Sequence, residues 1–256
     1  MTENVLSARL MGVADMITPR SYVCDVGCDH GFLDIYLIKH GLITGAIASD
    51  VRPGPIMAAR ENVSRAGFSD VIKTVLSDGL KEVEVPDSHS TLVMAGMGGP
   101  LILKMIRESI NKVRLFDEII ISPQSKVEEV RENFPDLGLI TVKESMVYDA
   151  GKFYNIIKLV NKDIIKTEYN EATELIEKNA GASAGRICNR YGALLIRKSD
   201  PVLKKYLEWE NNILRKNALS IKQAGNPEKY TKVLTDIEDN EITFKLMEVM
   251  YGYDHN

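Results

Sequence analysis

The sequence predicts an α/β protein: a Rossmann-like domain built on a seven-stranded sheet, followed by a helical coiled-coil domain. From about residue 21 to residue 160, short apolar runs alternate with amphipathic stretches, as in a parallel sheet with crossover helices. The alternation ends in two β-rich segments joined by a turn, and after residue 162 the apolar spacing becomes helical. We therefore expect one domain over residues 1–161 and a second over 162–256.

Five short apolar runs form the predicted parallel strands, at 22–26, 46–49, 71–76, 92–95 and 118–121. Amphipathic helices are predicted between them, at 32–40, 55–66, 101–113 and 126–133. Gly41 and Gly67 directly follow two of these helices, and glycine just past the last turn is a common helix stop. A further helix is predicted before the first strand, at 4–17, because its apolar residues fall on one side.

Two β-rich segments, at 139–147 and 153–160, break the alternation, and the turn at 149–152 separates them. Five crossover-linked strands followed by an antiparallel hairpin make the seven-stranded sheet of S-adenosylmethionine (SAM)-dependent methyltransferases. Dinucleotide dehydrogenases usually lack that final hairpin. The strand pattern thus favours the methyltransferase type of Rossmann-like sheet.

The last third of the chain has helical periodicity. A short helix is expected at 168–179 and a bend at 181–185. Within the segment 201–223, Leu207, Leu214 and Ile221 recur every seven residues, and a second long helix follows the turn at 225–227. This spacing predicts an antiparallel helical hairpin of the coiled-coil type.

Composition restricts the class of protein. The 256 residues are 45% hydrophobic and 27% charged, which is ordinary for a globular chain, and no apolar run approaches the length of a membrane span. The first residues lack a basic-then-apolar export signal, so we expect a cytoplasmic protein that does not contact membranes. The sequence leaves the oligomeric state open, and a monomer is the simplest expectation.

Cysteine and histidine spacing argues against metal and redox sites. Cys24, Cys28 and Cys188 lack the paired spacing of a zinc site or of a redox Cys-x-x-Cys pair, so we interpret them as small buried residues. The four histidines share no ligand spacing. We therefore expect no metal.

A glycine-rich segment follows the first predicted strand, and it reads Asp25-Val26-Gly27-Cys28-Asp29-His30-Gly31. Glycines there let backbone N–H groups approach a ligand at the strand end where such sheets bind cofactors. The segment is not the Gly-x-Gly-x-x-Gly dinucleotide fingerprint but resembles methyltransferase motif I, with Asp29 in place of the middle glycine. A carboxylate there would repel a pyrophosphate but suits SAM, whose ammonium and sulfonium groups are cationic; an ordinary tight turn is the alternative. The predicted cofactor-binding residues are Asp25, Gly27, Cys28, Asp29, His30 and Gly31.

Two further acids end predicted strands. Asp50 lies about twenty residues after the glycine-rich segment, where a carboxylate can accept both ribose hydroxyls of a nucleotide cofactor. Asp78, followed by Gly79, ends the third strand. An acid at this place can accept a hydrogen bond from the adenine amino group, while the glycine leaves room for the ring. An Asp-Gly turn is the alternative for this pair.

Glycines also follow the fourth predicted strand, in Ala95-Gly96-Met97-Gly98-Gly99. We expect Ala95, Gly96 and Met97 to line the cofactor pocket, although Met97 is also a candidate core residue. Gly98 and Gly99 would open space for a flat substrate. After the fifth strand, Ser122-Pro123-Gln124 offers polar groups at the same edge of the sheet.

Together these motifs resemble the bacterial tRNA (adenine-22, N1)-methyltransferase family. The likeness is carried by residues 25–31, 95–99 and 151–157, and it extends over nearly the whole chain. The Asp-His pair within motif I, combined with Gly-Met-Gly-Gly, is not shared by generic methyltransferases. The resemblance implies SAM as cofactor, tRNA as partner and methyl transfer to N1 of an adenine in the D-loop region. It also places Asp29 beside the reaction centre and Asp50 on the ribose of SAM.

A catalytic role for Asp29 follows as a hypothesis. N1 of adenine lies on the Watson–Crick edge, so the base must leave its pairing or stacking before it reacts. Neutral N1 carries its own lone pair, so alignment with the sulfonium would do most of the work. Positive charge develops on the base during transfer, and the Asp29 carboxylate would stabilise it. His30 is the competing candidate, as a proton shuttle.

A basic segment would reconcile the net charge of −4 with an RNA partner. Between residues 186 and 222, nine Lys and Arg stand against three acids. We expect Lys204 and Lys205 of this segment, and Arg9 near the pocket mouth, to bind substrate. A solvated helix face is the alternative for the segment.

Two other functions remain open on the sequence alone. A SAM-dependent methyltransferase that acts on another RNA or protein site would share motif I and Asp50. The second open function is a SAM-binding protein that interacts with RNA without catalysis. It stays open because Asp29 replaces the middle glycine of the motif.

Overall fold

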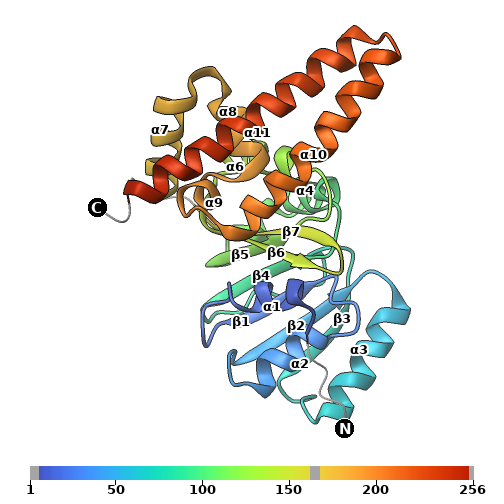
Figure 1. The fold of residues 1–256 in the computed structure, drawn as a ribbon. Coiled ribbons are helices and arrows are strands. Elements are labelled where there is room, and N and C mark those ends of the chain that lie inside the picture. The colour runs from blue at the N-terminus through green and yellow to red at the C-terminus, as the bar shows by residue number, and fades with distance from the viewer. Residues whose placement is uncertain (1–5, 162–167, 254–256) are drawn as a thin grey trace. The chain divides into compact units, whose positions relative to one another are not determined.

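The computed structural model describes residues 6–161 and 168–253, with side chains up to residue 250. The chain divides into two compact units, Met1–Asp163 and Ile164–Asn256, which are called unit 1 and unit 2 below. Unit 1 is built on a single sheet and unit 2 is helical (Figure 1).

The sheet of unit 1 has seven strands in the order β3-β2-β1-β4-β5-β7-β6. Neighbouring strands are parallel except around β7, which pairs antiparallel with both β5 and β6. The predicted fold class, a Rossmann-like sheet completed by an antiparallel hairpin, is confirmed. The strands are β1 (Tyr22–Val26), β2 (Gly45–Asp50), β3 (Ile72–Leu76), β4 (Ser90–Ala95), β5 (Glu118–Ser122), β6 (Leu139–Asp149) and β7 (Lys152–Asn161).

Two apolar clusters hold the sheet between its helices. On β5, Ile119 and Ile121 lie in one cluster and Ile120 in the other, because successive side chains leave opposite faces of a strand. The first face is covered by α4 (Gly99–Glu108), α5 (Ile110–Val113) and α6 (Val127–Leu137). The second is covered by α1 (Ala8–Ala14), α2 (Phe32–Lys39) and α3 (Pro53–Ala66).

Two helices of unit 1 differ from the prediction. The N-terminal helix spans Ala8–Ala14 rather than 4–17, because the Ser7 hydroxyl caps it by accepting the Leu10 N–H (3.3 Å). Predicted residues 4 and 5 lie outside the described residues. The single helix expected at 101–113 is two helices, which are interrupted at Ser109, where φ is −123°.

Unit 2 confirms the predicted helical extension. It consists of α7 (Glu168–Ala180), the 3-10 turn Gly181–Ser183, α8 (Ala184–Tyr191), α9 (Ala193–Arg197), α10 (Pro201–Gln223) and α11 (Pro227–Tyr253). The long helices α10 and α11 run antiparallel side by side (Figure 1), with Leu214, Ala218 and Val233 buried between them. The bend expected at 181–185 is instead the 3-10 turn and the start of α8, and neither α8 nor α9 was predicted.

Candidate cofactor and substrate site

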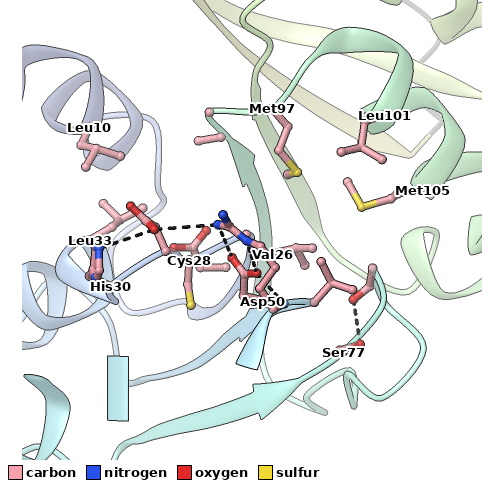
Figure 2. Close-up of a pocket in the computed structure, with 18 of the residues that line it drawn as sticks. Leu10, Val26, Cys28, His30, Leu33, Asp50, Ser77, Met97, Leu101 and Met105 are labelled. Carbon is pink, nitrogen blue, oxygen red and sulfur yellow. Dashed lines mark hydrogen bonds and ion pairs between the residues drawn. The ribbon is translucent and has the colours of Figure 1, made fainter. Parts of the chain in front are cut away.

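A cavity of about 590 Å³ lies in unit 1 at the carboxyl ends of β1, β2 and β4. The strand order reverses between β1 and β4, and open α/β sheets bind their ligands at such a point. Figure 2 shows Leu10, Leu33 and His30 on one side, and Met97, Leu101 and Met105 on the other. Asp50 lies between these two walls (Figure 2).

The turn between β1 and α2 borders the cavity and has an unusual backbone. The N–H groups of Gly27 and Cys28 both donate to the Ser49 carbonyl of β2, at 2.8 and 2.9 Å. Gly27 and Gly31 have positive φ angles of 81° and 70°, and so does Asp29, at 52°. Left-handed backbone suits glycine, so the Asp29 side chain costs conformational energy there. Such strain is typical of a residue held in place for its function.

Three carboxylates converge on this cavity. Asp25 and Asp50 are each 5% exposed, whereas Asp29 is exposed. Burial raises the pKa of Asp25 to about 7, the Arg9 guanidinium opposes that rise, and the Asp50 carboxylate adds to it. A cationic ligand would relieve the repulsion among these acids, so the site favours positive charge.

Arg9 is held at the cavity by the β6–β7 hairpin. Its backbone N–H donates to Asp149 (3.1 Å), and its guanidinium lies over the Tyr154 ring, 5.6 Å from the centroid. Its Nη1 is buried and has no hydrogen-bond partner among the described residues. Buried donors are normally satisfied, so this nitrogen is suited to an acceptor on a ligand.

The loop after β3 forms another part of the cavity wall. The Ser77 hydroxyl donates to the Gly79 carbonyl (2.9 Å) and accepts the Glu82 N–H (3.1 Å), which fixes the shape of the loop. The Asp78 carboxylate is exposed and hydrogen-bonds Lys81, which lowers the pKa of Asp78. An adenine amino group would therefore compete with Lys81 for this carboxylate.

Most of the predicted cofactor residues meet at the cavity. Met97 lines the cavity and also packs against the core, so it is both a cavity residue and a core residue. Of the predicted substrate residues, Arg9 also lines the cavity. The predicted cofactor residues that line it are Asp25, Gly27, Cys28, Asp29, His30, Asp50, Asp78, Gly79, Ala95, Gly96 and Met97.

Three predicted glycines do not line the cavity. Gly31 caps α2 with a φ of 70°, a left-handed conformation that favours glycine, while a Cβ there would make only an ordinary contact with Ala59 of α3 at 3.4 Å. Gly98 is the N-cap of α4, and Gly99 is its first residue. A Cβ on Gly99 would lie 2.6 Å from the Ser125 carbonyl oxygen, so Gly99 allows close backbone packing, and its role in opening space for a substrate stays a prediction.

The basic segment of unit 2 is largely neutralised by acids of the same unit. The surplus along residues 186–222 therefore does not form one uninterrupted basic face. Four lysines of the basic segment form no ion pair with a described residue: Lys204, Lys205, Lys216 and Lys222. The pairs are Arg186 with Asp239, Arg190 with Glu210 and Asp236, Arg197 with Glu168 and Glu171, Lys198 with Glu168, and Arg215 with Glu241.

Several cavity residues were not predicted. Leu101 and Met105 stand four apart on α4, so helical spacing after the glycine segment was the available signal. Arg52 follows Asp50 by two residues, and its guanidinium lies beside that acid. Phe32 begins α2 next to His30, with the two rings 5.6 Å apart.

Among the described residues, no group of three His, Cys, Asp or Glu side chains is arranged to hold a metal ion. Over residues 6–161 and 168–253, no helix is both long and apolar enough to cross a membrane.

The sheet topology, the motif I turn and the strand-end acids define a class of protein. Residues 6–157 match the family model described as a methyltransferase domain, which is more than half of the chain. The chain therefore belongs to the methyltransferase domain family.

More specific relatives match nearly the whole chain. The tRNA (adenine(22)-N(1))-methyltransferase of Bacillus subtilis (strain 168) is 26% identical over 241 residues, which are 93% of this chain and 95% of that relative. The crystal structure of a putative tRNA (m1A22) methyltransferase from Streptococcus pneumoniae aligns with a TM-score of 0.78 and 26% identity, over 93% of this chain and 99% of that one. Its structure in complex with S-adenosyl-L-methionine aligns with a TM-score of 0.77, 26% identity and the same coverage. The family resemblance of the sequence is thus confirmed.

Proposed function

We propose that this protein transfers the methyl group of SAM to N1 of the adenine at position 22 of tRNA. The observation that carries the proposal is the match to the Bacillus subtilis enzyme, which runs through both units and not the methyltransferase domain alone. We assign cofactor binding and chemistry to residues 1–161 and a supporting role in tRNA binding to residues 162–256. A tRNA substrate makes the cytoplasm the expected compartment.

The cofactor is SAM, and the donor set of the cavity fits it. SAM supplies a methyl group on a positively charged sulfonium. Asp50 would accept hydrogen bonds from the ribose hydroxyls, and the buried Asp25 would face the ammonium group. The loop after β3 and the apolar side chains of Met97, Leu101 and Met105 would enclose the adenine.

We propose that Asp29 acts on the charge that develops during methyl transfer. Its carboxylate borders the cavity from the motif I turn, and the His30 Nε2 lies 3.7 Å from it. The target adenine presents N1 only after it leaves the stack, and it attacks with its own lone pair. The ring becomes cationic as the N1–CH₃ bond forms, and the Asp29 carboxylate stabilises that charge. His30, beside Asp29, is the competing candidate, as a proton shuttle.

Three basic residues are proposed to bind the RNA. Arg9 offers its unsatisfied Nη1 at the cavity, where a base or phosphate oxygen would accept it. Lys204 and Lys205, at the start of α10, form no ion pair with a described residue and would contact backbone phosphates.

The test is incorporation of labelled methyl groups from SAM into unmodified bacterial tRNA, followed by nucleoside analysis. We expect N1-methyladenosine at position 22 and no incorporation into the same tRNA with guanine at that position. A methylated product at another RNA or protein site would favour the first alternative function. SAM binding without turnover on any RNA would favour the non-catalytic RNA-interaction protein and would contradict the proposal.

A further inference from the structure

Arg52 lies on the carboxylate that a nucleotide ribose would use. Its backbone N–H donates to Asp50 Oδ1 (2.8 Å), which holds residue 52 close to the end of β2. Its Nε lies 3.3 Å from Asp50 Oδ1, and its Nη2 lies 3.5 Å from Asp50 Oδ2 and 3.9 Å from Asp29 Oδ1. The Arg52 side chain is 66% exposed, whereas that of Asp50 is buried.

The guanidinium and a ribose compete for the same oxygens. A ribose that donates both hydroxyls needs both oxygens of Asp50, and each of them faces Arg52. Because Asp50 is buried and lines the cavity, a ligand reaches its carboxylate from the cavity side. Figure 2 marks the contacts of the Asp50 carboxylate on that side with dashed lines. A bound ribose therefore weakens or displaces the contact between Arg52 and Asp50.

We propose that Arg52 is a tRNA-binding residue that the cofactor releases. When the ribose takes the Asp50 carboxylate, the guanidinium turns outward and binds a phosphate of the RNA at the rim of the cavity. This step rests on the proposed function, because it takes the second ligand to be tRNA. The planar guanidinium fork matches a phosphate group, and the side chain is already exposed.

The charges around the cavity explain why such a residue is needed. Asp25, Asp29 and Asp50 together repel an RNA backbone. While Arg52 pairs with Asp50 and Asp29, its charge is compensated by those acids. Once it is displaced from Asp50, it offers phosphate a cation at the rim, and only when the cofactor is bound.

This exchange couples the two ligands. If the cofactor strengthens tRNA binding by some factor, tRNA must strengthen cofactor binding by the same factor. Removal of the Arg52 charge should therefore have opposite effects on the two ligands. It should strengthen cofactor binding in the absence of tRNA, and it should weaken tRNA binding in the presence of cofactor. A residue with a purely structural role would weaken both.

The experiment uses the full chain, S-adenosylhomocysteine, which has no methyl group to transfer, and an unmodified tRNA transcript with adenine at position 22. Calorimetry should show that Arg52→Gln binds S-adenosylhomocysteine about two- to fivefold more tightly than the wild type, the range expected when an exposed ion pair is removed. Filter binding should show that saturating S-adenosylhomocysteine tightens wild-type tRNA binding about fivefold. In Arg52→Gln, S-adenosylhomocysteine should not change tRNA affinity.

Arg65→Gln is the matched control, because Arg65 is an exposed arginine on α3 of the same unit, and this variant should behave as the wild type. Unchanged or weaker S-adenosylhomocysteine binding by Arg52→Gln would overturn the exchange at Asp50. A wild-type response of tRNA affinity to S-adenosylhomocysteine in Arg52→Gln would overturn the phosphate contact. If the wild-type protein binds S-adenosylhomocysteine but no tRNA, the proposed function itself fails. The calorimetry would still test whether the cofactor displaces Arg52 from Asp50.

Discussion

Asp29 combines an unfavourable backbone conformation with a carboxylate at the proposed reaction centre. Its φ of 52° suits glycine, so Asp29→Gly should raise the free energy of unfolding by about 1 kcal/mol. The same change removes the negative charge beside the base and should slow methyl transfer about 10- to 100-fold. Thermal unfolding and single-turnover methylation of tRNA measure the two effects.

A second variant separates charge from shape at this position. Asn tolerates left-handed backbone almost as well as Asp, so Asp29→Asn should keep wild-type stability and still lose most of the rate. A wild-type rate in Asp29→Gly would rule out a catalytic role for the carboxylate. A loss in the glycine variant alone would assign the effect to backbone shape.

Asp25 should make cofactor binding depend on pH. Its pKa is raised to about 7, so the carboxyl group is mostly neutral at pH 6 and mostly ionised at pH 8. The ionised form attracts the ammonium group of the cofactor, so affinity should rise with pH, by up to about tenfold over this interval if only that form binds. Calorimetric titration of S-adenosylhomocysteine from pH 6 to pH 8 measures the change.

The variant Asp25→Asn is the control for this pH dependence. It should bind S-adenosylhomocysteine weakly, with an affinity that varies little from pH 6 to pH 8. A wild-type affinity that is flat across the same interval would show that Asp25 does not titrate there.

At the scale of elements, Gly99 sets how closely α4 approaches the segment that leads into α6. A Cβ at this position would lie 2.6 Å from the Ser125 carbonyl oxygen and 2.6 Å from Val130 Cγ2. A backbone carbonyl cannot rotate away as the end of a side chain can. Gly99→Ala should therefore lower the free energy of unfolding by about 1–3 kcal/mol, as measured by urea denaturation.

Gly54→Ala is the matched control, because Gly54 also lies in the first turn of a helix, α3, with no atom within 4 Å of an added Cβ. Gly54 precedes Pro55 as Gly99 precedes Pro100, so both variants carry the same restriction on a residue before proline, and Gly54→Ala should lower the free energy of unfolding less than Gly99→Ala. Equal stability of the two variants would contradict the packing role of Gly99.

The elements that the sequence predicted well are those with clear boundaries in apolar pattern or glycine. The parallel strands and the final hairpin are such elements. The predicted start of β4 missed Ser90 and Thr91, which are polar yet buried; the Thr91 hydroxyl donates to Glu118 (2.8 Å). The short helix α9 was missed because four of its five residues are buried, which leaves little alternation of polar and apolar positions, whereas α8 was missed because Gly181 and Gly185 led us to expect a bend there.

The same limit applies to the site. Strand-end residues such as Asp25 and Asp50 were predictable, because parallel strands bring their carboxyl ends to one edge of the sheet. Whether a glycine lines a cavity or lies against a neighbouring element depends on distances set by the tertiary fold, and for this reason the sequence did not indicate that Gly31 and Gly99 lie outside the cavity lining. Arg52 was missed because its importance lies in a contact, not in a motif.

At the scale of the whole molecule, charge pairing decides which cations are available to RNA. Unit 2 contains fourteen Lys and Arg and fourteen Asp and Glu. Its arginines hold helices together: Arg190 contacts Glu210 of α10 and Asp236 of α11, and the Tyr191 hydroxyl donates to the same Glu210 (2.8 Å). Counting basic residues along the sequence therefore overstates the RNA-binding surface of this unit.

The lysines at the start of α10 should account for part of the salt dependence of tRNA binding. Each phosphate contact contributes about 0.7–0.9 to the slope of log affinity against log salt, so Lys204→Gln/Lys205→Gln should reduce that slope by up to about 1.8. S-adenosylhomocysteine affinity should stay unchanged, and Lys229→Gln, near the start of α11, should leave the slope unaltered. A wild-type slope in the double variant would mean that these lysines do not contact phosphate, and that the tRNA affinity of this acidic protein depends on other cations, Arg9 and Arg52 among them.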